Sequence, residues 1–245
     1  MPNPRFYHPE KLAPGATITL TPNAAVHASR ALRLQVGDKA TLFNGDGNDY
    51  VCELILVKKI EVVAKVRSIR HVDSESPLKI SLAQAISSGD RMDYTIQKAV
   101  EMGVCSIQPI ASQRSVVKLS GERAEKRREH WQNVVISACE QSGRAILPPV
   151  APPLSLANWL AQPSAATLRI TLSPTAEQCL HDLPTPQGEI CLLIGAEGGL
   201  TDDEIATAAS QGFIPVRLGN RILRTETASL AAISAMQTLW GDFNG

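Results

Sequence analysis

Two glycine-containing turns near the C-terminus hold the residues best placed to recognise a ligand. Residues 192–205 read LLIGAEGGLTDDEI, and residues 217–232 read RLGNRILRTETASLAA. In each of them glycine follows a short apolar run, and glycine lets the backbone approach a ligand closely. A strand that ends in such a turn and opens a helix presents unpaired backbone N–H groups. The pattern predicts a pocket that binds its ligand through backbone donors.

Local signals predict the elements that position these turns. Thr201 and Glu204 form a capping box, so a helix is expected to begin at Asp202 and to stop before the next glycine. The second turn is expected to follow a strand at residues 214–218 and to precede a helix that begins around Thr225. Two such turns can face each other across a crevice at the carboxyl ends of adjacent parallel strands.

Length and composition indicate a globular protein. The chain has 245 residues, of which 44% are hydrophobic, and its formal net charge is zero. This is enough for one large core or two modest ones. No apolar run approaches the roughly 18 residues of a membrane span, and residues 1–10 lack the features of a secretion signal. We therefore expect a soluble cytoplasmic protein without a membrane partner.

The cysteines and histidines do not indicate a metal site or a disulfide framework. The number of cysteines, five, is odd, and no two of them have CxxC spacing. They are expected to be reduced thiols, mostly small core residues. The five histidines are scattered. No metal is expected, and no Ser/His/Asp or Cys/His arrangement can be recognised.

Charge and composition divide the chain near residue 72. Residues 1–72 hold ten Lys/Arg and six Asp/Glu, and residues 73–245 hold fourteen and eighteen. The dividing segment, residues 72–77, reads VDSESP and resembles a linker in being polar and ending in proline. We therefore expect two domains, at residues 1–72 and 73–245.

The first part has mainly β signals. Strands are expected at residues 16–20, 40–43, 50–57 and 60–69, with a hairpin at the Asn-Gly-Asp-Gly sequence and a helix at residues 22–34. A small β-barrel with one helix follows from this pattern. Arg5, Arg30 and Arg33 could contact phosphates, because a guanidinium offers paired donors to oxygen anions. Ordinary solvated charge explains the same residues equally well.

In the second part strands alternate with helices. Strands are expected at residues 78–86, 104–110 and 168–172, and helices at residues 91–102 and 122–142, with a short helix around Trp159. The charge run at residues 123–128 is explained by a solvated helix face somewhat better than by an RNA contact. The alternation predicts an α/β domain with a largely parallel sheet covered by helices.

Five motifs in order carry a family resemblance over nearly the whole chain. They are PRFY at Pro4, YTIQKAVEMGV at Tyr94, ACEQSGR at Ala138, LLIGAEGGL at Leu192 and LGNRILRTETA at Leu218. Together they resemble the bacterial 16S rRNA uridine-N3 methyltransferases, which belong to the SPOUT class. The resemblance implies an N-terminal PUA-like β-barrel, a C-terminal SPOUT-type α/β domain with a deep trefoil knot, and a homodimer.

The resemblance also implies a cofactor and its contacts. The methyl donor would be S-adenosylmethionine, held by loops at residues 172–174, 195–199 and 218–223. The implied contacts are Leu172, Ser173, Gly195, Ala196, Glu197, Gly198, Gly199, Leu218, Gly219, Ile222, Leu223 and Ala228. The family usually has proline in place of Ala196, a change that leaves the backbone donors present. A tight strand-to-helix connection without a ligand would explain either turn alone.

The implied substrate is a uridine near the 3′ end of 16S rRNA, in the assembled 30S subunit. N3 of uracil carries a proton, so its methylation requires a proton acceptor and stabilisation of an anion. We hypothesise that Arg224 stabilises the anion and that Glu197 or Glu226 accepts the proton. The alternatives are a plain Arg224–Glu226 pair and a Glu197 that holds the loop or binds hydroxyl groups of the donor.

RNA contacts are expected in both parts of the chain. The candidate residues are Arg5, Arg30, Arg33, Arg114, Arg144 and Arg221. Arg144 lies in the ACEQSGR motif, where an ordinary helix end explains the glycine equally well. Two other functions remain open: ribose 2′-O-methylation by a related SPOUT enzyme, and a ribosome assembly factor without catalysis.

Overall fold

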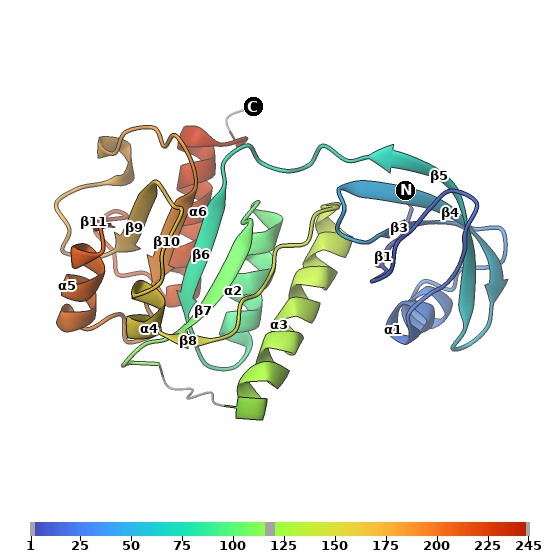
Figure 1. Cartoon of the computed structure of the whole chain (residues 1–245), viewed down its shortest axis with the longest axis horizontal. Coiled ribbons are helices and arrows are strands. Elements are labelled where there is room, and N and C mark those ends of the chain that lie inside the picture. The colour runs from blue at the N-terminus through green and yellow to red at the C-terminus, as the bar shows by residue number, and fades with distance from the viewer. Residues whose placement is uncertain (1–2, 116–120, 244–245) are drawn as a thin grey trace. The chain divides into compact units, whose positions relative to one another are not determined.

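The structure is a computed structural model that describes residues 3–115 and 121–243 (Figure 1). The chain forms two compact units. The first contains residues 1–75 and 136–147, and the second contains residues 76–135 and 148–245. None of the described helices is long and apolar enough to cross a membrane.

A five-stranded sheet forms the first unit, in the order β1-β3-β4-β5-β2. The strands are β1 (Arg5–Tyr7), β2 (Thr17–Thr19), β3 (Lys39–Phe43), β4 (Asn48–Val57) and β5 (Val62–His71). β1 runs parallel to β3, and the other pairs are antiparallel. The predicted hairpin joins β3 to β4, and its glycines, Gly45 and Gly47, have positive φ. The inward side chains of these strands form one core with the helix described next.

The helix of the first unit is shorter than predicted. α1 (Pro22–Val26) continues into one π-helical turn (His27–Ala31), whereas the sequence pattern predicted a helix over residues 22–34. Arg33 has φ +54°, a left-handed conformation that cannot continue a right-handed helix. The side chain of Thr21 caps the N-terminus by accepting from the backbone of Ala24. The packed face carries Ala24, Ala25 and Ala28.

The end of a long helix also belongs to the first unit. α3 (Gly121–Ser142) contributes residues from 136 onward. Glu140 accepts a hydrogen bond from the backbone N–H of Tyr7 at 2.9 Å, and Arg5 donates to the backbone carbonyl of Arg144 at 3.1 Å. The sequence did not indicate that this segment, which begins 59 residues after Pro77, returns to the first unit.

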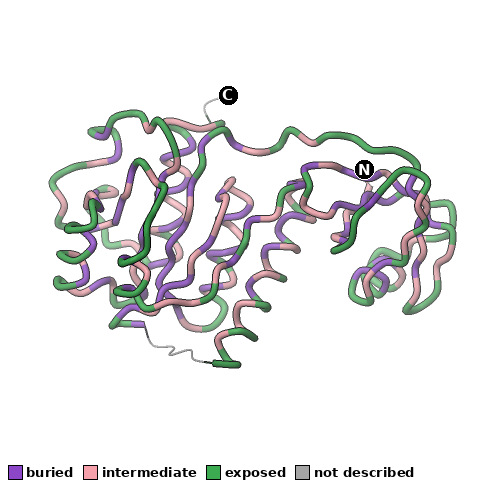
Figure 2. The backbone as a smooth tube through the Cα atoms, viewed as in Figure 1, coloured by how far each residue is buried: buried purple, intermediate pink, exposed green. Residues whose placement is uncertain are grey.

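The second unit contains a six-stranded sheet in the order β11-β9-β10-β6-β7-β8. The strands are β6 (Ile80–Ala85), β7 (Ser106–Ala111), β8 (Leu154–Ser155), β9 (Leu168–Leu172), β10 (Ile190–Ile194) and β11 (Phe213–Val216). All five pairings are parallel, which confirms the predicted α/β class. Every residue of β10 is buried, as Figure 2 shows by its purple trace near the centre of the sheet.

Helices cover this sheet on both faces. α2 (Asp90–Glu101) and α6 (Thr225–Trp240) pack together behind the sheet in Figure 1, and α4 (Leu156–Leu160) lies in front of it. α5 (Asp202–Ser210) contacts α4 and β11, and a short 3-10 helix spans Leu180–Asp182. The predicted helices around residues 91–102 and 122–142 are confirmed to within one residue at either end. β1, β8 and the 3-10 helix were not predicted.

Candidate functional site

A cavity of about 420 Å³ lies at the carboxyl ends of β9, β10 and β11. Three loops line it, one after each of these strands. The two predicted glycine turns follow β10 and β11 and both line the cavity, but β9 separates these strands in the sheet, whereas the sequence pattern predicted that they would be adjacent. The lining includes all twelve residues that the family resemblance implied as donor contacts: Leu172, Ser173, Gly195, Ala196, Glu197, Gly198, Gly199, Leu218, Gly219, Ile222, Leu223 and Ala228. The tertiary structure therefore brings together three segments that are separated by up to 56 residues in the sequence.

The first glycine turn is folded tightly on itself. The N–H of Gly199 donates to the carbonyl of Ala196 at 2.9 Å, and Gly199 has φ +70°. A Cβ atom on Gly195 would lie 2.7 Å from the carbonyl carbon of Gly199 and 2.8 Å from the nitrogen of Leu200. Both neighbours are backbone atoms, so a side chain at residue 195 would force the turn open. Glycine at this position therefore follows from the close approach of the backbone, and positive φ is required only at Gly199 in this turn.

A buried polar network holds the beginning of this turn. The hydroxyl of Thr225, the first residue of α6, donates to the carbonyl of Gly195 at 2.6 Å. The amide of Gln84 in β6 donates to the same hydroxyl at 3.0 Å, and Ser229 donates to the Gln84 oxygen at 2.6 Å. Gln84 and Ser229 are fully buried. Sequence reasoning missed both, although a lone glutamine inside the apolar run of a central strand was a signal, because such a group must find partners.

The carboxylate of Glu197 is already occupied by hydrogen bonds, whereas a general base needs an oxygen that is free to accept a proton. Its carboxylate accepts from the N–H of Ser88 at 2.9 Å, the hydroxyl of Ser88 at 2.8 Å and the guanidinium of Arg91 at 3.0 Å. Burial opposes ionisation, but the hydrogen bonds from Ser88 and Arg91 outweigh it and lower the pKa of Glu197 to about 2. A carboxylate this acidic is a weak proton acceptor at neutral pH. The geometry favours the loop-holding role that the sequence left open for Glu197.

Arg224 and Glu226 lie beside the cavity and not in its lining. Their neighbours Leu223 and Thr225 do line it, and Arg224 is the N-cap residue of α6. Arg224 is exposed, and in the described part of the chain it forms no ion pair with Glu226. Glu226 is half-buried, and its buried Oε2 has no hydrogen-bond partner among the described residues. This leaves Glu226 as the candidate proton acceptor with an unused oxygen.

The candidate RNA-binding arginines divide into different environments. Arg114 and Arg221 line the cavity, and Arg114 donates to backbone carbonyls of the first glycine turn. Arg30 and Arg33 are exposed on the first unit, where neither has an ion pair with a described residue. Of the arginines predicted to contact RNA from that unit, these two remain accessible to phosphates.

The other two candidates have structural roles. Arg5 pairs with Asp49, which is 1% exposed, and Arg144 is 3% exposed and pairs with Glu75. Arg144 Nε donates to Glu75 at 2.9 Å. Because both guanidiniums are engaged inside the first unit, the structure disfavours the RNA contacts predicted for Arg5 and Arg144.

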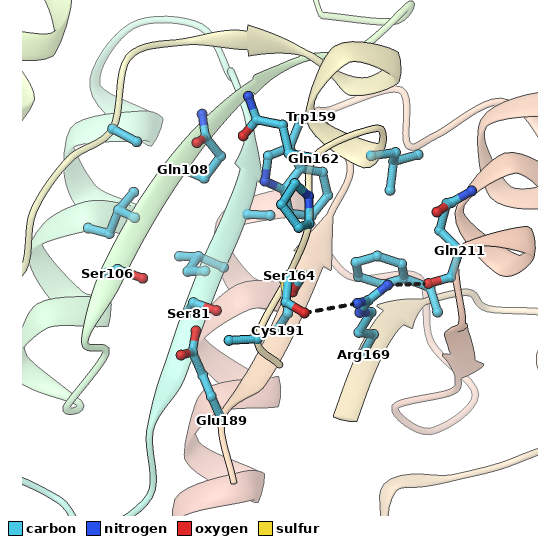
Figure 3. Close-up of a pocket in the computed structure, with 18 of the residues that line it drawn as sticks. Ser81, Ser106, Gln108, Trp159, Gln162, Ser164, Arg169, Glu189, Cys191 and Gln211 are labelled. Atoms are coloured by element: carbon cyan, nitrogen blue, oxygen red, sulfur yellow. Dashed lines mark hydrogen bonds between the residues drawn. The ribbon is translucent and has the colours of Figure 1, made fainter. Parts of the chain in front are cut away.

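A second cavity, of about 280 Å³, lies on the sheet face that carries α4 (Figure 3). Its floor comes from the amino-terminal halves of the strands, where Ser81, Ser106, Arg169 and Cys191 lie. Arg169 donates to the carbonyls of Gln211 at 2.6 Å and Ser164 at 3.3 Å. The lining of this second cavity contains no glycine turn and none of the predicted site residues. We therefore place the candidate site in the larger cavity.

No group of three or more potential metal ligands occurs within residues 3–115 and 121–243. The five cysteines are free thiols. Burial raises the pKa of Cys52, Cys139 and Cys191 to about 11, so these thiols are poor nucleophiles. The polar groups that line the larger cavity are backbone groups, hydroxyls, arginines and carboxylates.

The sequence matches known families of RNA methyltransferases over most of its length. A family model described as an RNA methyltransferase domain matches residues 74–237, and one described as an RNA methyltransferase PUA domain matches residues 20–67. A ribosomal RNA small subunit methyltransferase E from Buchnera aphidicola is 35% identical over 243 residues, covering 98% of both chains. The chain belongs to the ribosomal RNA small subunit methyltransferase E family. The family resemblance that the five sequence motifs indicated is confirmed.

Two solved structures of similar proteins agree closely with the fold. The enzyme from Neisseria gonorrhoeae, bound to S-adenosylmethionine, is 46% identical with a TM-score of 0.92 and covers 98% of this chain and 99% of its own. A putative methyltransferase from Legionella pneumophila, in complex with S-adenosylmethionine, is 39% identical with a TM-score of 0.95 and covers 99% of this chain and all of its own. The predicted combination of a PUA-like domain with a parallel α/β domain is confirmed.

Proposed function

We propose that the chain transfers a methyl group from S-adenosylmethionine to N3 of a uridine in 16S rRNA. One observation carries the proposal: all twelve implied donor contacts line a single cavity at the ends of three adjacent strands. The relatives with bound S-adenosylmethionine cover nearly the whole chain, which supports the same donor here.

The cavity suits a ligand with a polar, planar edge and apolar faces. Its glycine turns offer backbone groups, and the side chains of Leu218, Ile222 and Leu223 offer apolar surface. Ile222 is 88% exposed, an unusual state for a large apolar side chain beside a cavity. A bound adenine ring would cover it. The donor supplies an electrophilic methyl group on a positively charged sulfur, so this step requires no metal.

Residues of the chain would accept the N3 proton and stabilise the negative charge that develops on the uracil. We assign Glu226 as the acceptor of the N3 proton, because its Oε2 has no described partner and its neighbour Thr225 lines the cavity, whereas Glu197 is held by Ser88 and Arg91. As the proton leaves, the nitrogen pair forms the bond to the methyl carbon and the carbon–sulfur bond breaks. We assign Arg224 to stabilise the negative charge that develops on the uracil oxygens, since its exposed guanidinium lies at the start of α6.

We further propose that the substrate is the decoding region of the assembled 30S subunit and that the enzyme acts as a homodimer in the cytoplasm. Arg30 and Arg33 would contact the RNA backbone from the first unit, and Arg221 would do so at the cavity. Phosphate contacts of this kind release counterions, so affinity should fall with salt. The trefoil knot stays a prediction of the family resemblance.

The test is to incubate the protein with S-adenosylmethionine and small ribosomal subunits from a strain that lacks this enzyme. After digestion of the RNA, mass spectrometry identifies the methylated nucleosides. We expect N3-methyluridine with the wild type, and at least about a hundredfold slower formation with Glu226→Gln or Arg224→Ala. A 2′-O-methylated nucleoside would reassign the reaction, and RNA binding without methylation would favour an assembly factor.

A further inference from the structure

Arg114 contacts the first glycine turn in a way that an RNA-binding arginine does not require. It follows β7, and one of its terminal nitrogens donates to the carbonyl of Gly198 at 2.7 Å and to that of Leu200 at 3.2 Å. A Cβ atom on Gly198 would lie 3.2 Å from both Cβ and Cδ of Arg114. The arginine stem therefore lies against the turn, and a side chain at residue 198 would require it to shift by a few tenths of an ångström.

A rigid support presents Arg114 to the turn. The flanking residues Ser112 and Ser115 are buried and close a small turn, with their hydroxyls 3.0 Å apart. The N–H of Gln113 donates to Glu204 at 2.7 Å, and the other oxygen of Glu204 accepts from Thr201 at 2.9 Å. The loop after β7 is thereby attached to the N-terminus of α5, directly after the glycine turn. An exposed arginine that only bound RNA phosphates would not need such support.

The two contacts hold the peptide groups on either side of a backbone donor that belongs to a residue of the cavity lining. Peptide groups are planar, so fixing the carbonyl of Gly198 and that of Leu200 fixes two peptide planes. The peptide between them carries the N–H of Leu200, which donates to no described residue although Leu200 lines the cavity. An unpaired donor in a cavity wall is free to bind a ligand acceptor.

We propose that Arg114 is a positioning residue for the methyl donor: it holds the Gly198 and Leu200 carbonyls so that the Leu200 N–H faces the donor's acceptor atoms. The proposal rests on the proposed function, because it requires S-adenosylmethionine in this cavity. It replaces the RNA contact that the sequence suggested for Arg114. Preorganised donors of this kind lower the cost of binding because the loop is already ordered.

The test measures donor binding and RNA use separately. Isothermal titration calorimetry with S-adenosylmethionine is expected to show a Kd about tenfold higher for Arg114→Ala, which is 1.4 kcal/mol. Arg114→Lys, which keeps the charge but not the forked geometry, should recover part of the loss. The KM for small ribosomal subunits, measured at saturating donor, should stay within about twofold of wild type.

A matched control is Arg169→Ala. Arg169 also donates to two backbone carbonyls, but in the second cavity, so its loss should leave donor affinity unchanged. Thermal unfolding of each variant would check that it is folded. If the Kd for S-adenosylmethionine is unchanged in Arg114→Ala, the proposal is wrong. If in addition the KM for small ribosomal subunits is raised, Arg114 contacts the RNA, as the sequence suggested. If the wild type binds no S-adenosylmethionine, the proposed function itself fails.

Discussion

Replacing Gly195 by alanine tests whether the shape of the first glycine turn creates the donor site. The added Cβ would meet three backbone atoms of Gly199 and Leu200, at 2.7 to 2.9 Å. Ordinary contact begins near 3.4 Å, so the turn must open by about 0.7 Å at the closest point. The carbonyl of Gly195 is also held by Thr225, which prevents the chain from moving the other way.

The expected magnitudes follow from this clash. Overpacking of a well-packed site costs about 1–3 kcal/mol of unfolding free energy. For a chain of this size, each kcal/mol lowers the Tm by about 2–4 °C. A shift of about 0.7 Å takes a hydrogen bond near 2.9 Å to a length where it contributes little. Losing one or two backbone contacts to the donor should raise its Kd by tenfold or more, at about 1.4 kcal/mol for each factor of ten.

Gly198→Ala provides the matched control in the same turn. Its Cβ would lie 3.2 Å from side-chain atoms of Arg114, which can move by a few tenths of an ångström. We therefore expect a small loss of donor affinity for Gly198→Ala and a large one for Gly195→Ala, both measured by calorimetry beside thermal unfolding. Equal affinities for the two variants would refute the reasoning that the backbone contact at Gly195 shapes the site.

Three further predictions concern charge and burial. Because the folded pKa of Glu197 is lowered from 4.5 to about 2, its contribution to stability is present above pH 4.5 and lost as the pH falls through 2. Acid titration of the unfolding free energy should therefore be less steep for Glu197→Gln, and an unchanged slope would contradict the pairing. Asp49→Ala leaves Arg5, 13% exposed at its side chain, without its buried partner, and should cost about 3–5 kcal/mol in denaturant unfolding against a milder Asp49→Asn. The buried thiols are Cys52, Cys139 and Cys191, and Cys179 is half-buried. A thiol reagent at about pH 8 should therefore modify Cys179 before these three. If peptide mapping found the reverse order, burial would not control the reactivity of these thiols.

Local patterns in the sequence predicted most elements around the site. The capping box of Thr201 and Glu204 forms as expected and starts α5 at Asp202. α6 begins at Thr225, as the second turn predicted. These predictions hold because caps, turns and the periodicity of apolar residues depend on neighbours within a few residues. One end differed from the prediction: the helix after Pro22 ends early, where Arg33 has a left-handed conformation that the apolar periodicity did not indicate.

The sequence by itself therefore determined two glycine turns after buried strands, and through its motifs the family to which the chain belongs. Only the tertiary structure decided what holds the turns: Arg91 pairs with Glu197 and Arg114 binds Gly198, across 106 and 84 residues. The same holds for Gln84 and Thr225, which meet across 141 residues. Such pairs follow from the order of strands in the sheet, in which β6, the strand before Arg91, lies beside β10, and β7, the strand before Arg114, lies beside β6. Strand order is a global property, and no short-range pattern encodes it.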